Sequence, residues 1–203
     1  MAARSAGTPP PGPRPGRTRS ETARRAILEA TRDQLAEHGY DKLSIDRVAA
    51  AAGVGKQTVY RWYPSKSALV AEGILLGYVF SPGIDIQDSG DVRRDITAWA
   101  RAFADYSVEP GAAALVRAAT AATAEDADVA ARFQEQITGA TQAALAGRLR
   151  RGVDAGQLTP GAPVDTAAET IVGALIYRIL TRQALSPAFV AELVDTVFQG
   201  IQA

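Results

Sequence analysis

Residues 45–63 read IDRVAAAAGVGKQTVYRWY, and this stretch decides how the rest of the chain is interpreted. Two short apolar segments are separated by only Gly53 and Val54. This spacing predicts two helices that cross at a tight turn, because Gly53 can adopt the positive φ that such a turn needs. The positions that would face between the helices are apolar or small, as a helix-turn-helix requires: Val48, Ala49, Ala52, Val54, Val59 and Trp62.

The second of these helices carries hydrogen-bonding side chains on its outward face: Lys56, Gln57, Thr58, Tyr60 and Arg61. Lys and Arg can bond guanine, Gln can bond adenine, and hydroxyl groups can bond phosphates or base edges. Between Lys42 and Lys66 the chain has five basic residues and one acid, Asp46, so this segment is cationic. An acid repels phosphate, and Asp46 is therefore left out of the predicted DNA-binding site. The alternative interpretation is a polar helix face that only contacts solvent.

Charge separates the chain into two parts. The 203 residues include 22 basic and 22 acidic side chains, so the formal net charge is zero. Residues 1–70 hold twelve basic and six acidic side chains, whereas residues 71–203 hold ten and sixteen. This asymmetry predicts two modules, of which only the first suits a polyanionic partner.

Composition excludes several kinds of protein. The absence of cysteine rules out disulfide bonds and a thiol nucleophile, and the single histidine argues against a multi-histidine metal site. No apolar run reaches the roughly 18 residues of a membrane-spanning helix. We therefore expect a cytoplasmic protein without metal, cofactor, membrane contact or enzymatic activity.

The first twenty residues differ in composition from the rest. They contain five of the eleven prolines, four arginines and no acid, which predicts a disordered basic arm over residues 1–20. Arg14, Arg17 and Arg19 either enter a minor groove or follow the phosphates, as N-terminal arms of other DNA-binding domains do, or they only contribute diffuse charge.

Helical periodicity runs through the remaining chain, and no sustained alternating pattern indicates a strand. The first helix is expected to start near Thr18, where Thr18 and Glu21 fit a capping box, and to end at His38-Gly39. The other helices are expected over residues 45–52, 55–63, 65–80, 91–107, 110–123, 126–152, 164–185 and 187–201. The sequence thus predicts an all-α protein of about nine helices, with a DNA-binding domain over residues 21–69 and a helical effector-binding and dimerisation domain over residues 70–203.

A set of short motifs surrounds the two crossed helices: His38-Gly39-Tyr40, Val48-Ala49, Gly53-Val54, Thr58-Val59-Tyr60, and Ser65-Lys66 followed by Leu69. With these motifs, residues 22–69 resemble the DNA-binding domain of the tetracycline-repressor (TetR/AcrR) family of bacterial regulators. The resemblance implies base-reading and phosphate-binding roles. The implied base readers are Lys56, Gln57 and Arg61, and the implied phosphate ligands are Ser44, Thr58, Tyr60 and Lys66. No operator sequence is implied, because Arg61 and Trp62 stand where many members have an aromatic residue followed by histidine.

An aromatic face follows in the second domain, where Trp99, Phe103 and Tyr106 share one side of a helix. The family resemblance implies an effector cavity in this region, and apolar walls suit a hydrophobic or aromatic ligand. Core packing is the alternative for the aromatic residues, whereas an arginine, if buried, needs an anionic partner. The candidate pocket residues are Trp99, Phe103, Tyr106, Arg117, Phe133, Ile137 and Arg178.

The last two predicted helices are apolar over more than one face. Such helices need two packing partners, which predicts that they contact both the body of the subunit and a second subunit. The resemblance favours a dimer interface of two such helices from each subunit, and the alternative is a core that lies wholly within one subunit. The candidate interface residues are Ile171, Leu175, Ile179, Val190, Val194 and Val197.

These features together predict a homodimeric, sequence-specific regulator that binds double-stranded operator DNA. The preferred hypothesis is a repressor that a small, mainly apolar ligand releases from its operator. An activator, or a regulator without a ligand, is the alternative within this class. From other classes, a small-molecule binding or sequestering helical protein with a vestigial DNA-reading element, or an all-helical enzyme, remains open.

Overall fold

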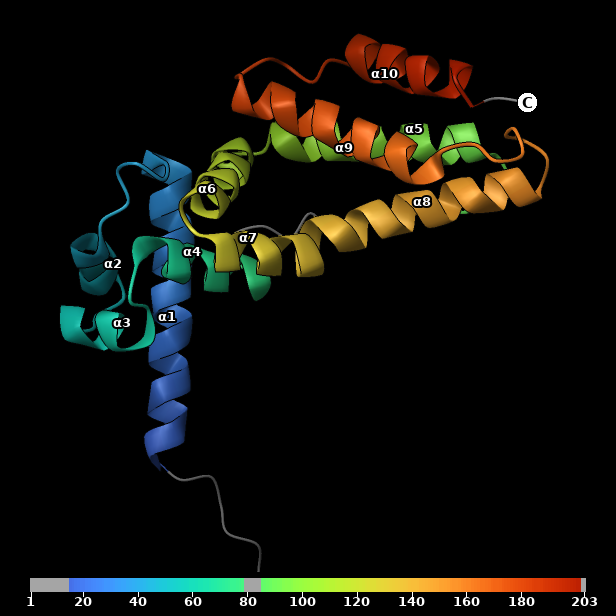
Figure 1. The fold of residues 1–203 in the computed structure, drawn as a ribbon. Coiled ribbons are helices and arrows are strands. Elements are labelled where there is room, and N and C mark those ends of the chain that lie inside the picture. Colours follow the sequence, from blue (N-terminus) through green and yellow to red (C-terminus); the bar gives the residue numbers. More distant parts are fainter. Residues whose placement is uncertain (1–14, 79–84, 202–203) are drawn as a thin grey trace, which may run out of the picture.

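The computed structural model describes residues 15–78 and 85–201, which form ten α-helices, one π-helical turn and no strand (Figure 1). The predicted all-α class is therefore confirmed. None of the described helices is long and apolar enough to cross a membrane. The helices are α1 (Pro15–His38), α2 (Ile45–Ala51), α3 (Lys56–Trp62), α4 (Lys66–Leu75), α5 (Val92–Ser107), α6 (Ala112–Glu125), α7 (Ala127–Phe133), η1 (Gln134–Thr138), α8 (Gly139–Asp154), α9 (Val164–Leu180) and α10 (Pro187–Gln199).

The first helix starts earlier than the sequence pattern predicts. α1 begins at Pro15, because proline has the fixed φ of a helix and loses no hydrogen bond in the first position. Thr18 therefore lies inside the helix and not at its N-cap, and the last residues of the predicted arm are helical. Arg14 and the residues before it lie outside the described residues, as do the side chains of Arg17 and Arg19.

Two predicted helix boundaries in this module are confirmed. α1 ends before Gly39, which has a φ of 77° and whose N–H donates to the Leu35 carbonyl. Ser65 is the N-cap of α4, where its Oγ accepts a hydrogen bond of 3.0 Å from the Ala68 N–H. Both ends therefore use the capping chemistry that the residue types predict.

Two predicted helices in the second domain differ from expectation, one by an internal π-helical turn and one by an earlier end. The segment predicted as one helix over residues 126–152 is divided into α7, the π-helical turn η1 and α8. Gly139 allows this turn, because a Cβ there would lie 2.5 Å from the Gln134 carbonyl oxygen. α9 ends at Leu180 and not near residue 185, since Arg182 takes a left-handed φ of 58°.

The first of two hydrophobic cores joins α1–α4 to α6 and to Val129 of α7. The predicted domain boundary, between residues 69 and 70, lies inside α4, and Leu69, Val70 and Ile74 all belong to this core. Leu115 of α6 is part of the same core. The helix-turn-helix module is therefore packed directly against a helix of the second domain, and Figure 1 shows α6 beside α1 and α4.

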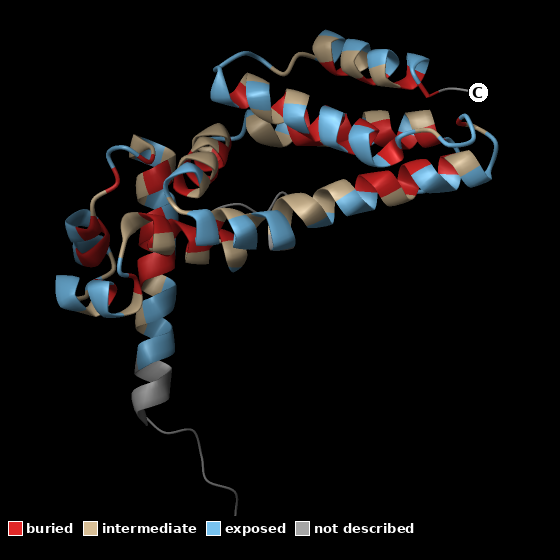
Figure 2. Cartoon of the chain, viewed as in Figure 1, coloured by how far each residue is buried: buried red, intermediate tan, exposed pale blue. Residues whose placement is uncertain are grey.

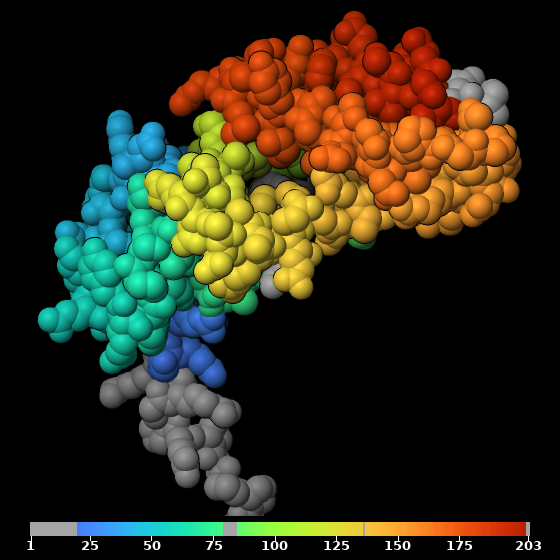
Figure 3. Space-filling model, in the orientation of Figure 1, coloured from blue at the N-terminus to red at the C-terminus, as the bar shows by residue number. Residues whose placement is uncertain are grey.

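The second core lies among α5, α8, α9 and α10, with contributions from α6. α9 is its central helix, because it packs against α5, α6, α8 and α10. In the space-filling view this helical body forms a separate lobe from the α1–α4 module, and α6 and α7 join the two (Figure 3).

A buried ion pair crosses the second lobe. The Nε and Nη2 atoms of Arg148 each lie 2.7 Å from Oδ2 of Asp95, and each side chain is only 2% exposed. Ser89 donates its N–H (3.1 Å) and its hydroxyl (2.5 Å) to the same carboxylate. Burial alone raises the pKa of Asp95, but the hydrogen bonds from Ser89 and Arg148 outweigh burial and hold this pKa below its ordinary value.

The predicted dimer-interface residues lie inside the subunit. Ile171, Leu175, Ile179, Val190 and Val194 are at most 4% exposed and belong to the second core, and Val197 packs against it (Figure 2). The wide apolar face of α9 is explained by its central position, because four helices of the same subunit cover it. Five of the six candidate interface residues are therefore covered within the subunit, Val197 is half-buried, and a contact between subunits through α9 would use its outward residues.

Candidate nucleic-acid interface

The local sequence builds a rigid helix-turn-helix from α2 and α3. Val48 and Val59 are fully buried between them, and Ala49 is 3% exposed where the helices approach. Gly53 has a φ of 66°, a value that suits glycine in the turn, and the Val54 N–H donates to the Ala49 carbonyl at 3.0 Å. The predicted geometry of residues 45–63 is thus present, and it fixes which side chains of α3 point outward.

The outward side of α3 is exposed (Figure 2), and it carries the cations Lys56 and Arg61. Tyr60 is 45% exposed, Arg61 and Gln57 are also exposed, and Thr58 is half-buried. The Arg61 guanidinium lies 5.7 Å from the centre of the Trp62 ring, so a cation–π contact stabilises the charged group at the surface. These side chains can reach a groove without rearrangement of the core.

Two predicted phosphate ligands flank this surface. Ser44 is half-buried at the N-cap of α2, and its side chain makes no capping hydrogen bond there. Lys66 is half-buried in the first turn of α4, with its Nζ 4.0 Å from the centre of the Tyr40 ring. The same Nζ donates to the Tyr40 carbonyl at 3.2 Å. Lys66 therefore holds the Tyr40 turn as well as presenting a charge.

Lys56, a predicted base reader, has an acidic partner within the module. Its Nζ lies 2.7 Å from Oδ1 of Asp46 on α2, and 5.7 Å from the centre of the Tyr60 ring. The hydrogen bond to Asp46 and its negative charge raise the pKa of Lys56 above its ordinary value. Asp46 is left out of the site predicted from the sequence because an acid repels phosphate. Its contact with Lys56 was not predicted, since no spacing rule connects residues ten positions apart across a turn.

The five aromatic and aliphatic residues of the predicted pocket are divided between the two hydrophobic cores. Trp99 and Phe103 are each 4% exposed and stack with ring centres 5.7 Å apart, and half-buried Tyr106 packs against the same core. Ile137 touches both cores, whereas Phe133 packs only against the first. The aromatic face is thus brought together, but Phe133 belongs to the module side of the junction.

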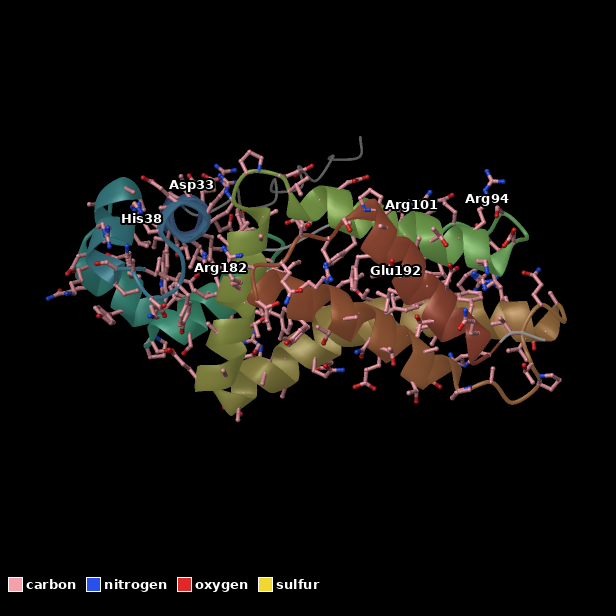
Figure 4. The ribbon with its side chains drawn as sticks, turned by 90° about the horizontal axis from the view of Figure 1, so that it is seen from above. Asp33, His38, Arg94, Arg101, Arg182 and Glu192 are labelled. Carbon is pink, nitrogen blue, oxygen red and sulfur yellow. The ribbon has the colours of Figure 1, made fainter. Side chains whose placement is uncertain are left out.

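The two arginines of the predicted pocket behave differently. Arg178 donates to the Ala184 carbonyl at 2.7 Å, and its guanidinium lies 3.7 Å from the centre of the Phe189 ring, so it holds the α9–α10 connection. Arg117 on α6 is half-buried, and desolvation followed by the nearby charge of Arg182 lowers its pKa. Figure 4 shows Arg182 beside α6. Neither arginine pairs with a carboxylate in the described part of the chain, and Arg117 is the one whose pKa burial and a neighbouring cation lower.

An open surface pocket of about 450 Å³ lies at the far end of the second lobe, where α5 begins and α10 ends. None of the predicted pocket residues lines it; its walls are Gly90, Asp91, Val92, Arg93, Gly156, Gln157 and Phe198. It is separate from the aromatic face around Trp99.

Sequence reasoning also missed a contact between the two lobes. The Tyr40 hydroxyl donates to Oε2 of Glu125 at the end of α6, at 2.5 Å. Burial, followed by this hydrogen bond, raises the pKa of Tyr40. In the sequence Tyr40 stands out only as a motif residue and Glu125 does not stand out, because a separation of 85 residues leaves no local signal.

In this fold α3, the second helix of the helix-turn-helix, is exposed and carries cations. These features define a helix-turn-helix DNA-binding protein with a helical second domain. The family model of bacterial regulatory proteins of the tetR family matches residues 27–72, and that of the tetracyclin repressor-like C-terminal domain matches residues 86–197. The chain belongs to the TetR family of transcriptional regulators, and the predicted family is confirmed.

Relatives cover most of the chain. The HTH-type transcriptional regulator YdeS of Bacillus subtilis is 27% identical over 93% of this chain and 94% of its own. An HTH-type transcriptional regulator of Mycobacterium bovis is 31% identical over 84% of this chain and 83% of its own. The solved TetR family transcription regulator SCO0332 is 30% identical with a TM-score of 0.65, covering 89% of this chain and 99% of that one.

Proposed function

We propose that this regulator is a homodimeric repressor that binds operator DNA through α3 and that a small, mainly apolar effector releases it. The outward face of α3 carries the proposal, because its donors are exposed while α2 and the first core hold its backbone. In such a dimer the two copies of α3 would enter successive major grooves, roughly 34 to 36 Å apart. Regulation of this kind involves no catalysis, and it takes place in the cytoplasm.

The proposed release depends on contacts that join the DNA-binding module to α6 and α7. α4 packs against α1, α6 and α7. Glu72 of α4 pairs with Arg24 of α1 and lies 3.8 Å from the Arg132 guanidinium of α7. Together with the Tyr40–Glu125 hydrogen bond, these contacts let a shift of α6 or α7 change the position of α3. Allosteric coupling typically amounts to about 1 to 3 kcal/mol, which a few such contacts can supply.

The effector is expected between the aromatic face of α5 and the α6–α7 segment. Figure 3 shows the surface hollowed between the α6–α7 segment and α9. We expect half-buried Tyr106, which packs against the core that holds the Trp99–Phe103 stack, to give the ligand apolar contact, and Arg117 to give a cation for an acidic group. Fold relatives under 25% identical include the flavonoid-responsive regulator FrrA, FadR of Bacillus subtilis in complex with stearoyl-CoA, and a gamma-butyrolactone receptor. Their names support a small-molecule effector without indicating which one.

The outward stripe of α9 is the proposed dimer contact. Thr166, Thr170, Gly173, Tyr177 and Leu180 recur every three or four residues, and all are exposed. Tyr177 is 62% exposed and Leu180 38%, while a Cβ at Gly173 would meet nothing within 4 Å. An exposed stripe with an open glycine at its centre and the large side chains of Tyr177 and Leu180 beyond it suits close approach of the same helix from a second subunit.

Selection of duplexes from a random library with the full-length protein tests this function. We expect a near-palindromic operator with half-sites one helical turn apart, and a dimer in sedimentation at micromolar concentration. Failure to prefer any sequence at moderate salt would favour the sequestering alternative, and a monomer would contradict the dimer separately. Once an operator is known, release of the fluorescent duplex by apolar carboxylic acids, compared with their methyl esters, tests the effector and the role of Arg117.

A further inference from the structure

The recognition surface contains an acid that touches one of its own cations. Asp46 lies in the first turn of α2, Lys56 is the first residue of α3, and the Oδ1–Nζ distance is 2.7 Å. The side chains are 64% and 52% exposed, so the pair stands in solvent beside the outward face of α3. Its stabilising effect on the fold is small, since exposed ion pairs contribute little. The main consequence of the pair is therefore for the binding of DNA to this surface.

The pair changes the charge that the module presents to DNA. Among the five cations from Lys42 to Lys66, Arg47 donates to a backbone carbonyl, and Arg61 and Lys66 lie against aromatic rings. Those contacts leave the positive charges uncompensated. Within the described residues, Lys56 alone of the five has a salt bridge to a carboxylate. An acid in the first turn of α2 suits the helix dipole, but the dipole does not require contact with Lys56.

A carboxylate and a phosphate compete for the same ammonium group. When Lys56 turns to a phosphate it must leave Asp46, and the free carboxylate then repels the DNA backbone. Non-specific binding consists almost entirely of such phosphate contacts, and each neutralised phosphate contributes about 0.9 to the slope of log affinity against log salt. A guanine edge in a matched operator offers Lys56 an additional, geometry-dependent contact. The carboxylate therefore penalises random DNA more than it penalises the operator.

We infer that Asp46 is a specificity-determining residue, which acts as an intramolecular counter-ion for Lys56 and weakens binding to non-operator DNA more than binding to operator DNA. The inference rests on the DNA-binding function of this family. It gives a role to Asp46, which the sequence analysis left out of the DNA-binding site.

The decisive variant is Asp46→Asn, which keeps the size of the side chain and removes its charge. Fluorescence anisotropy would compare a library-selected operator with a scrambled duplex of the same composition between 50 and 200 mM salt. We expect the variant to bind the scrambled duplex several-fold more tightly, with a salt slope steeper by about 0.9, and to gain less on the operator. The ratio of the two affinities therefore falls.

Asp33→Asn is the matched control. Asp33 stands on α1, where its partner is the neighbouring Arg32 at 2.7 Å (Figure 4). This control makes the same change in net charge without freeing a cation of the recognition surface. We expect it to leave both the slope and the ratio unchanged. Equal effects of the two variants would mean that overall charge matters, and would overturn the inference.

The background Lys56→Gln decides whether Asp46 acts through Lys56. The steeper salt slope of Asp46→Asn should disappear in that background, because no ammonium remains to be released to a phosphate. Only a smaller gain, equal on both duplexes, should remain from removing the repulsive carboxylate. If Asp46→Asn instead weakens operator binding and leaves scrambled binding unchanged, Asp46 accepts a hydrogen bond from a base and the counter-ion role is wrong. Wild-type binding to the selected operator tests the DNA-binding function itself, so the two failures are distinguishable.

Discussion

The two lobes use charge in opposite ways. In the helix-turn-helix module the cations are exposed or half-buried beside neighbours that leave them accessible, such as Arg61 over the Trp62 ring. In the second lobe Arg148 is 2% exposed, and the carboxylate of Asp95 neutralises its charge. The charged side chains of the first lobe are thus accessible to a binding partner, whereas the buried pair of the second lobe joins its helices. Substitutions should therefore affect DNA binding in one lobe and stability in the other.

The largest effect is expected from Arg148→Ala. This change leaves the Asp95 carboxylate buried without its cation, a situation that costs about 3 to 5 kcal/mol of unfolding free energy. Urea unfolding of the full-length protein measures the loss. Arg150→Ala is the control, because Arg150 pairs with Asp165 on the surface, where both side chains are more than half exposed.

If Arg148→Ala does not fold, the double variant Arg148→Met/Asp95→Leu decides the matter. Apolar replacement of both partners of a buried pair is often tolerated, so it should recover most of the stability. An equal loss for Arg148→Ala and Arg150→Ala would show that the buried pair has no special role, and the contrast between the lobes would fail.

The same contrast explains what the sequence could predict. The helix-turn-helix is visible in residues 45–63 because its core and its outward face repeat within two short helices, and Gly53 marks the turn. The aromatic face of Trp99 was predicted from helical spacing in the same way. Local periodicity thus predicts where helices form and which residues share one face of a helix.

Pairings between distant residues could not be predicted. Asp95 and Arg148 are 53 positions apart, and Tyr40 and Glu125 are 85 apart. The candidate interface residues of α9 illustrate a related difficulty. An apolar face such as that of Leu175 can be covered by the same subunit or by another, and only the packing of α5, α8 and α10 around it distinguishes the two.

A smaller effect, on binding and not on stability, is expected from Arg61→Ala. Arg61 is exposed, so its removal should leave the urea midpoint nearly unchanged. Loss of one base contact should weaken operator binding by about 1 to 3 kcal/mol and relax the preference at one position of the site. Anisotropy titrations against operator variants at that position measure both. A uniform loss on operator and scrambled duplexes would instead make Arg61 a phosphate ligand.

The smallest effect tests whether the lobes communicate. Tyr40→Phe removes the hydroxyl that reaches Glu125 and should lower stability by only about 1 kcal/mol. The Lys66 contact with the ring remains possible in the variant, so operator affinity without effector should change little. Release by the effector should weaken, because one of the contacts joining α6 to the module is lost. Effector titration of a preformed operator complex measures this.

Tyr63→Phe is the control for that experiment, since the buried Tyr63 hydroxyl has no hydrogen-bond partner in the described part of the chain. Removing it should be neutral or slightly stabilising, because a buried hydroxyl without a partner costs free energy. An unchanged effector response in Tyr40→Phe would place the coupling elsewhere, at Glu72 and its two arginines, which link α1, α4 and α7 through charge. In that case the Tyr40–Glu125 hydrogen bond would only fasten the lobes, and the signal would pass along α4, the helix that both the module and the second lobe pack against.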